Sequence, residues 1–395
     1  MKSYDLITPE GTRDLLYEEC AARRSAEETL RRIFISHGYS EVITPALEFY
    51  DVFNNKTRSI RQESMYKLTD EKGRLMSLRP DSTLPIARIV ATRLRGSALP
   101  LKLFYSQNIY RSNPKMSGRD DEITQSGIEI IGGGKKRSDL EALSLAAQVL
   151  DSFDSGEVRL EIGDNGFYKF LIKELGIEDD ETIRVLIKNK NTPELESVLA
   201  EFNGTDKEQA AKMLLSLPGL FGAGEVFEQA ERLFDYPELK SNLAQLKETY
   251  DALCKLEPAD RITVDLGLVN KADYYTGIIF RGYIEEYGQA VISGGRYDTL
   301  IGSFGGEEIA AVGFAANINA IAAALTGKVQ TRKPEVLVFA EEGHLTDGIR
   351  YCNDLSKKGH IAEYFDGETF DEAKKYAEQR GITRVDVVGA NGAGK

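Results

Sequence analysis

Cysteine and histidine are both scarce in this sequence, which has three of each among its 395 residues. The cysteines, Cys20, Cys254 and Cys352, show no CxxC or Cys/His spacing. Their scatter argues against a disulfide framework and against a zinc site, so we expect no metal and no other cofactor. His37 precedes Gly38 at the expected end of a helix, where a capping role is its simplest interpretation.

Long apolar stretches are also missing. No run of about 18 apolar residues occurs, and the first residues, MKSYDLITPEGTRD, lack the apolar core of a signal peptide. We therefore expect a cytoplasmic protein that has no membrane partner.

Basic residues are outnumbered by acidic ones. The chain has 50 Lys and Arg against 63 Asp and Glu, which gives a net charge of -13. A protein whose main task is to neutralise nucleic-acid phosphates normally carries the opposite excess. A local basic patch is compatible with this balance, but the composition argues against tRNA or DNA as a ligand.

The hydrophobic pattern predicts an α+β fold in residues 1–327. An amphipathic helix is expected within 13–37, followed by a strand over 41–47 that contains Pro45, as edge or interface strands do. A hairpin over 65–78 leads into the next helix. Further elements are expected at 138–152 and 313–325 (helices) and at 157–162, 262–269, 276–284 and 289–292 (strands). Helical spacing at about 167–257 predicts a helical insertion into this antiparallel sheet, which helices flank.

A polar linker near 328–334 separates this domain from a smaller one over 334–395. Strand patterns at 335–340, 361–365 and 384–388 alternate with two helical patterns, which predicts a small α/β domain of the βαβαβ type with a parallel sheet. From Lys333 onward there are 9 basic and 12 acidic residues, so the balance is 9 - 12 = -3. The glycine-rich segments 132–136 and 392–395 lack phosphate-loop spacing, and we expect a turn and a frayed tail there.

The stretch from Tyr105 to Gly132 carries the strongest indication of a site. It has the pattern of two strands around a polar loop, and strand alternation places Gln125, Gly127 and Glu129 on one face. The bare Gly127 allows a close approach to the sheet, and Arg111 ends the first strand. A cation, an amide and a carboxylate over one patch suit an amino acid. An ordinary solvent-facing side of a sheet explains the same alternation.

Several segments taken together resemble the catalytic core of histidyl-tRNA synthetase, a class II aminoacyl-tRNA synthetase. The resemblance runs from about residue 8 to 325. Its motifs are Gly11–Asp14, Gly38–Pro45 (motif 1), Leu78–Thr83, Tyr110–Gly132 (motif 2), Asp273–Gly277 with Gly294–Asp298 (the histidine-specific signature), and Ala311–Ala315 (the start of motif 3).

The chain departs from that family where the family binds ATP. Asn113 replaces a glutamate that reads adenine, Asn270 replaces an arginine that contacts carboxylate and phosphate, and Ala320 replaces the motif 3 arginine. Asp121 stands where another arginine is usual. Arginines that act on developing phosphoryl charge contribute roughly 10³ to 10⁵ in rate, so adenylate formation should be lost.

The amino-acid side of the family's site is retained. The resemblance implies a histidine-binding set that consists of Asp81, Thr83, Arg111, Gln125, Glu129, Tyr274 and Tyr275. Asp81 replaces the family's glutamate and keeps its charge with a shorter reach. Asp81 and Thr83 are also good helix-start residues, so capping alone would explain either one.

A synthetase fold without ATP chemistry, with Arg79-Pro80-Asp81 and a short acidic C-terminal domain, resembles the family of ATP phosphoribosyltransferase regulatory subunits. That resemblance implies a non-catalytic subunit of the first enzyme of histidine biosynthesis. Its partner would be the short form of the catalytic ATP phosphoribosyltransferase, and histidine would be its feedback effector. Motif 1 implies a dimer. The alternatives are an active histidyl-tRNA synthetase, or a synthetase paralogue that serves another partner.

Overall fold

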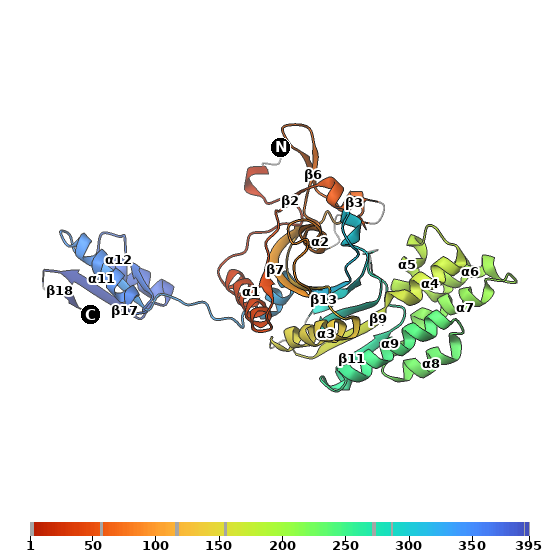
Figure 1. Ribbon diagram of the computed structural model, residues 1–395. Coiled ribbons are helices and arrows are strands. Elements are labelled where there is room, and N and C mark those ends of the chain that lie inside the picture. Colours follow the sequence, from red (N-terminus) through yellow and green to blue (C-terminus); the bar gives the residue numbers. More distant parts are fainter. Residues whose placement is uncertain are drawn as a thin grey trace. The chain divides into compact units, whose positions relative to one another are not determined.

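The structure is a computed structural model. It describes residues 4–55, 58–114, 118–153, 156–270, 274–285, 287–390 and 392–394. The chain forms two compact units, Met1–Lys328 and Val329–Lys395 (Figure 1). Within the described ranges, no helix is both long enough and apolar enough to cross a membrane.

A nine-stranded sheet forms the centre of the first unit. Its strands, in spatial order, are β1 (Ser40–Glu41), β7 (Leu101–Tyr110), β8 (Glu122–Ile131), β14 (Ala311–Asn317), β13 (Tyr287–Tyr297), β12 (Ile278–Ile284), β9 (Val158–Asp164), β11 (Ile262–Asp265) and β10 (Phe221–Gly222). The pairs β1–β7 and β9–β11 are parallel, and the other neighbours are antiparallel. This confirms the expected α+β class with a largely antiparallel sheet.

The β7–β8 hairpin is confirmed over ten residue pairs, from Leu101 opposite Ile131 to Tyr110 opposite Glu122. In this register Gln125, Gly127 and Glu129 alternate onto one face of the sheet. It is called the pocket face below because the candidate site lies on it.

Three helices cover the opposite face: α1 (Glu18–Ser36), α3 (Lys135–Asp151) and α10 (Ile318–Leu325). Phe34 of α1 is fully buried and its ring lies 5.7 Å from that of Phe104 and 6.1 Å from that of Phe314. Aromatic packing therefore anchors α1 to the central strands.

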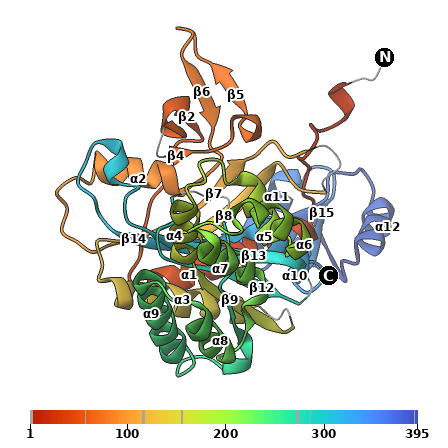
Figure 2. The ribbon, with the colours of Figure 1, turned by 90° about the vertical axis from the view of Figure 1, so that its right-hand side faces the viewer.

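One end of the pocket face is covered by α2 (Thr83–Ala91) and the segment before it. Leu84 of α2 belongs to a buried cluster with Leu103, Tyr105 and Tyr297 of the sheet. The small sheet β2 (Leu47–Phe49), β6 (Leu75–Leu78) and β5 (Lys67–Thr69) stands beside α2, and Figure 2 shows its hairpin projecting from the unit. The expected hairpin over 65–78 is confirmed. A further pair is β3 (Asn54–Asn55) with β4 (Arg58–Ser59).

The helical insertion lies between β9 and β11, beside the end of the sheet (Figure 1). Its helices are α4 (Asn165–Leu175), α5 (Glu181–Lys188), α6 (Thr192–Leu199), α7 (Glu208–Ser216), α8 (Glu225–Leu233) and α9 (Pro237–Leu253). Asp164 begins α4 by accepting a hydrogen bond from Gly166 N, and Gly176 ends it in the left-handed conformation. Short 3₁₀ helices occur at Tyr4–Leu6, Tyr50–Val52, Gln62–Ser64, Ala200–Phe202, Leu217–Gly219, Ala259–Arg261 and Gly302–Phe304.

The second unit has a four-stranded sheet in the order β16 (Ala362–Tyr364), β15 (Val336–Ala340), β17 (Arg384–Gly389) and β18 (Gly392–Gly394), with α11 (Leu345–Lys357) and α12 (Phe370–Arg380). The pairs β15–β16 and β15–β17 are parallel. The expectation of a frayed tail was wrong for Gly392–Gly394, because these residues pair with β17.

Two other expectations were wrong in detail. The strand over 41–47 is divided, and Pro45 lies between β1 and β2, where its carbonyl accepts a hydrogen bond of 2.9 Å from Arg79. The helix over 313–325 begins only at Ile318, because β14 occupies the preceding residues. Asn317 caps α10 by accepting a hydrogen bond from Ala320 N at 3.2 Å.

Candidate functional site

Glu129 lies at the centre of the pocket face. The residue is only 2% exposed. One carboxyl oxygen accepts a hydrogen bond of 2.9 Å from Thr83 Oγ1, and the other accepts one of 2.7 Å from Tyr297 OH. Burial raises the pKa of Glu129 to about 8. The two hydrogen bonds lower this pKa, but their effect is smaller than that of burial. β8, α2 and β13 thus meet at one carboxyl group.

Two glycines make room for side chains of the site. A Cβ atom at Gly313 would lie 2.0 Å from Glu129 Oε2. A Cβ atom at Gly127 would lie 2.8 Å from the hydroxyl of Tyr105 and 2.2 Å from the carbonyl oxygen of Phe314. The space that Gly127 leaves is therefore filled by the Tyr105 side chain and not left bare as expected, and the space over Gly313 is filled by the Glu129 carboxyl group.

Asp81 lies next to this centre at the start of α2. One carboxyl oxygen caps the helix by accepting a hydrogen bond from Leu84 N at 2.9 Å, and the other accepts one of 3.3 Å from Tyr274 OH. Helix capping therefore accounts for only one of the two carboxyl oxygens of Asp81. The Thr83 hydroxyl contacts Glu129 instead of a helical N–H group.

Arg111 supplies a positive charge beside Asp81. Its Nε donates to the Pro80 carbonyl at 2.8 Å, and its Nη2 lies 4.0 Å from Asp81 Oδ2. The side chain is 42% exposed, which leaves part of the guanidinium accessible to an anionic ligand.

Gln125 is separate from the contacts just described. It lies opposite Gln107 of β7 and Asn317 of β14, two positions along β8 from Gly127. Within the described residues, no hydrogen bond joins its side chain to Glu129. It lies on the same face as Glu129, as expected.

Four tyrosines surround the carboxyl groups. The rings of Tyr274 and Tyr275 lie 4.9 Å apart, and those of Tyr274 and Tyr297 meet edge to face at 5.9 Å. Burial raises the pKa of Tyr105, Tyr274, Tyr275 and Tyr297, and the charge of Glu129 adds to the rise in all four. Asp81 adds to it in Tyr105, Tyr274 and Tyr275. Their phenols are therefore protonated hydrogen-bond donors at neutral pH.

Tyr105 and Tyr297 were not among the expected site residues. Both had a sequence signal: Tyr297 belongs to the Gly294–Asp298 motif, and Tyr105 shares the alternation of β7 that places it opposite Gly127.

The loop at the end of β7 is held by its own hydrogen bonds. The Asn113 amide donates to Asp120 O at 2.9 Å and to Asp121 Oδ1 at 3.1 Å. Asp121 also accepts from the Asn113 backbone N–H at 3.0 Å and from Tyr66 OH, and it is 8% exposed. The buried carboxyl group of Asp121 thus occupies this end of the sheet.

The other two substituted positions offer no cation. Asn270 Nδ2 is 3.5 Å from Ser293 Oγ, and the Asn270 carbonyl accepts from Arg184 at 3.2 Å. Asp273 of the expected signature lies outside the described residues. Ala320 is 1% exposed within α10. In the described part of the chain, no three potential ligands are grouped as a metal site requires.

The fold and this site together define a histidyl-tRNA synthetase-like domain. Residues 11–321 match the sequence family described as histidyl-tRNA synthetase. A structure of histidyl-tRNA synthetase from Nostoc sp. has the same fold, with a TM-score of 0.76 at 20% identity over 98% of this chain and 92% of that one.

More specific relatives are found among curated proteins. An ATP phosphoribosyltransferase regulatory subunit from Bacillus cereus is 39% identical over 98% of this chain and 92% of its own length. One from Clostridium acetobutylicum is 39% identical over 95% of this chain and 94% of its own length. The chain belongs to the family of ATP phosphoribosyltransferase regulatory subunits. A Bacillus halodurans structure described as an ATP phosphoribosyltransferase regulatory subunit/histidyl-tRNA synthetase has a TM-score of 0.83 at 27% identity, covering 98% of this chain and 99% of that one.

Proposed function

We propose that this chain binds histidine in the pocket around Glu129 and regulates a catalytic ATP phosphoribosyltransferase, without amino-acid-activating chemistry of its own. The observation that carries the proposal is the buried carboxyl group of Glu129, held from two sides by Thr83 and Tyr297. Burial holds a proton on the ligand-free carboxyl group at neutral pH, and a neutral imidazole can take up that proton, so that the resulting imidazolium N–H donates to the carboxylate.

The neighbouring groups suit the rest of an amino acid. Asp81 provides a carboxylate for an α-ammonium group, and the exposed part of Arg111 provides a cation for an α-carboxylate. Gln125, on the same face, offers an amide that can donate and accept. Tyr274 and Tyr275 supply aromatic walls beside Glu129. Histidine combines all the chemical groups that this arrangement matches.

The contacts of Asn113 and Asp121 support the absence of ATP chemistry. Asp121 is a carboxylate at the position where the resembling synthetases usually carry an arginine, and the Asn113 amide is engaged within its own loop. Two negatively charged groups in close proximity repel each other, so this end of the sheet disfavours a nucleotide triphosphate. Asn270 and Ala320 supply no compensating positive charge.

The family relationship supports the partner. Its members are named as regulatory subunits of ATP phosphoribosyltransferase, and we infer that the partner here is a short-form catalytic subunit, which makes phosphoribosyl-ATP from ATP and phosphoribosyl pyrophosphate. Histidine would then act as feedback effector. It can do so only if it binds two states of the assembly with different affinities.

Self-association as a dimer is part of the proposal. Exposed apolar side chains gather on and before the small sheet: Ile43 is 78% exposed, and Leu47, Phe49 and Leu75 are more than 40% exposed. Leu47 and Phe49 pair with β6, which carries Leu75. An apolar edge of this kind suits burial against a second subunit.

The proposal is tested by two assays on the wild-type chain. Phosphoribosyl-ATP synthesis by a short-form catalytic subunit should rise when the chain is added and should then fall with histidine. ATP–pyrophosphate exchange by the chain alone, with histidine present, should be absent. Exchange in the second assay together with no effect in the first would identify an active synthetase instead.

A further inference from the structure

Arg296 is a buried charge behind the pocket. It is 1% exposed, and on β13 it lies between Gly295 and Tyr297, so alternation directs it to the face opposite the pocket. There its Nε and Nη2 lie 2.8 and 2.6 Å from Asp139 Oδ1 on α3, and Nη2 also donates to the Lys135 carbonyl at 3.1 Å.

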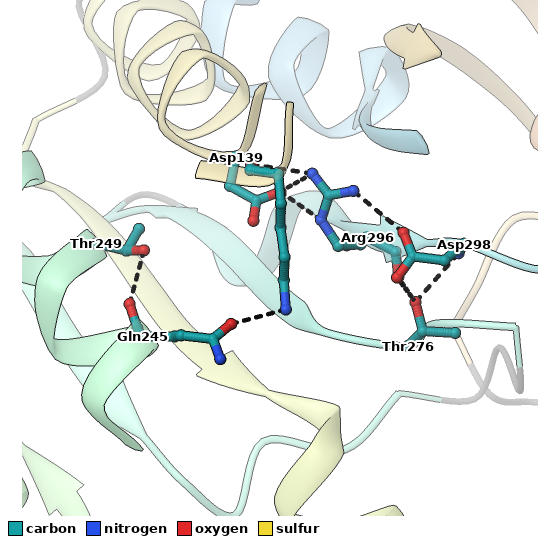
Figure 3. A network of polar contacts seen from close by, with 7 residues as sticks. Asp139, Gln245, Thr249, Thr276, Arg296 and Asp298 are labelled. Atoms are coloured by element: carbon teal, nitrogen blue, oxygen red, sulfur yellow. Dashed lines mark hydrogen bonds and ion pairs between the residues drawn. The ribbon is translucent and has the colours of Figure 1, made fainter. Parts of the chain in front are cut away.

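The same guanidinium also makes a second set of contacts, which Figure 3 shows. Its Nη1 donates to Asp298 Oδ1 at 3.1 Å. Thr276 Oγ1 donates to Asp298 Oδ2 at 2.8 Å and accepts from Asp298 N at 3.1 Å, while Thr276 N donates to Arg296 O at 2.8 Å. Thr276 is therefore fixed through both its backbone and its side chain.

These fixed residues alternate with pocket residues along the chain. Tyr275 directly precedes Thr276, and a Cβ atom at Gly295 would lie 2.7 Å from the Tyr275 ring. Tyr297 lies between Arg296 and Asp298, and its hydroxyl contacts Glu129. Any shift of the polar residues behind the sheet must therefore displace the tyrosine positions in front of it.

Stability alone is a weak reason for this network. Removing the Arg296 guanidinium and the Asp139 carboxylate from water is costly, and apolar replacements of buried ion pairs are often equally stable. What a branched network of charged hydrogen bonds provides is fixed geometry. A site that must recognise a small ligand benefits from such geometry in the groups behind its walls.

We propose that this network positions Tyr275 and Tyr297 for ligand recognition, so that Thr276 and Arg296 are positioning residues of the amino-acid site. The network, called the rear brace below, consists of Asp139, Thr276, Arg296 and Asp298. The proposal rests on the proposed histidine pocket.

Thr276 permits a test that keeps the fold. Thr276→Val removes the hydroxyl with little change in shape, and Thr276→Ser restores it. Thr326→Val is the matched control, because Thr326 Oγ1 donates one hydrogen bond of 3.0 Å to Ala322 O at the end of α10 and Thr326 is not part of the rear brace. Histidine affinity is measured by titration calorimetry, and the melting temperature of each full-length variant is measured alongside.

Thr276→Val should weaken histidine binding by about fivefold to tenfold, which is roughly the contribution of one hydrogen bond to binding. Thr276→Ser should bind within about twofold of wild type. Thr326→Val should do so as well, even where it lowers the melting temperature as much as Thr276→Val does. The brace would be overturned by any one of three results: wild-type affinity in Thr276→Val, failure of Thr276→Ser to restore binding, or an equal loss of affinity in Thr326→Val. A wild-type chain that binds no histidine would overturn the pocket itself, and the brace with it.

Discussion

The hydroxyl of Tyr297 donates a hydrogen bond of 2.7 Å to the carboxyl group of Glu129, across 168 residues of sequence. Thr83 donates to the same carboxyl group from α2. Three segments that are distant in sequence therefore converge on one buried acid, and the proposed recognition of histidine depends on that residue.

Glu129→Gln should weaken histidine binding by about tenfold or more. A glutamine side chain cannot pass a proton to imidazole and then accept from it, as the Glu129 carboxyl group can, and charge-assisted hydrogen bonds contribute about 1.5 to 3 kcal/mol. Titration calorimetry gives the affinity. Glu122→Gln on the same strand is the control, because Glu122 contacts Asn108 and Tyr110 on the other face. Equal affinity in both variants would place histidine elsewhere.

Tyr297→Phe should weaken histidine binding by about fivefold to tenfold, because Glu129 loses one of its two fixed donors. Tyr283→Phe is the matched control, since its hydroxyl donates to Glu161 at 3.0 Å outside the Glu129 cluster. The comparison requires affinities and melting temperatures for both variants. A similar loss of affinity in the two would show that the effect is not specific to Glu129.

The ligand-free chain should lose stability as pH rises from 6.5 to 8. Burial raises the folded-state pKa of Glu129 from 4.5 to about 8, so in this window the folded state holds a proton that the unfolded state has released. Asp164 and Asp265 have pKa values raised to about 6, so both are already largely ionised when this pH window begins. Glu129→Gln should therefore reduce the fall in unfolding free energy by up to about 1.4 kcal/mol per pH unit. Denaturant melts at four pH values measure both slopes, and identical slopes would mean that Glu129 is already ionised.

Histidine, but not ATP, should raise the melting temperature of the wild-type chain. A ligand at 100 times its dissociation constant stabilises the folded state by about 2.7 kcal/mol, whereas a nucleotide that does not bind leaves it unchanged. Asp121→Asn tests whether the buried carboxylate alone excludes ATP. A clear shift with ATP in the wild type would contradict the interpretation of Asn113 and Asp121.

Much of this architecture was accessible from the sequence. Alternation along β8 placed Gln125, Gly127 and Glu129 on one face, and the structure has them there. Local patterns could not give the partners of these residues. Thr83 has the chemistry of a helix-start residue, yet its hydroxyl is used by Glu129, which is 46 residues away. Such a choice depends on tertiary packing.

The misassigned helix at Gly313 has a similar cause. Its alanine-rich sequence favours a helix locally, but β13 and β8 both pair with residues 311–316 in the folded sheet. Glycine at 313 is required by the Glu129 carboxyl group, which lies where a Cβ atom would be. The brace around Arg296 was hidden for the same reason, because Asp139 is 157 residues away from it.

The most direct test of the account combines Glu129→Gln with the catalytic partner. Phosphoribosyl-ATP synthesis by a short-form catalytic subunit is measured with wild-type chain or with the variant, across a histidine titration. Both chains should support synthesis, and the variant should need at least about ten times more histidine for half-maximal inhibition. Superimposable inhibition curves would contradict the claim that histidine regulates the assembly through this pocket.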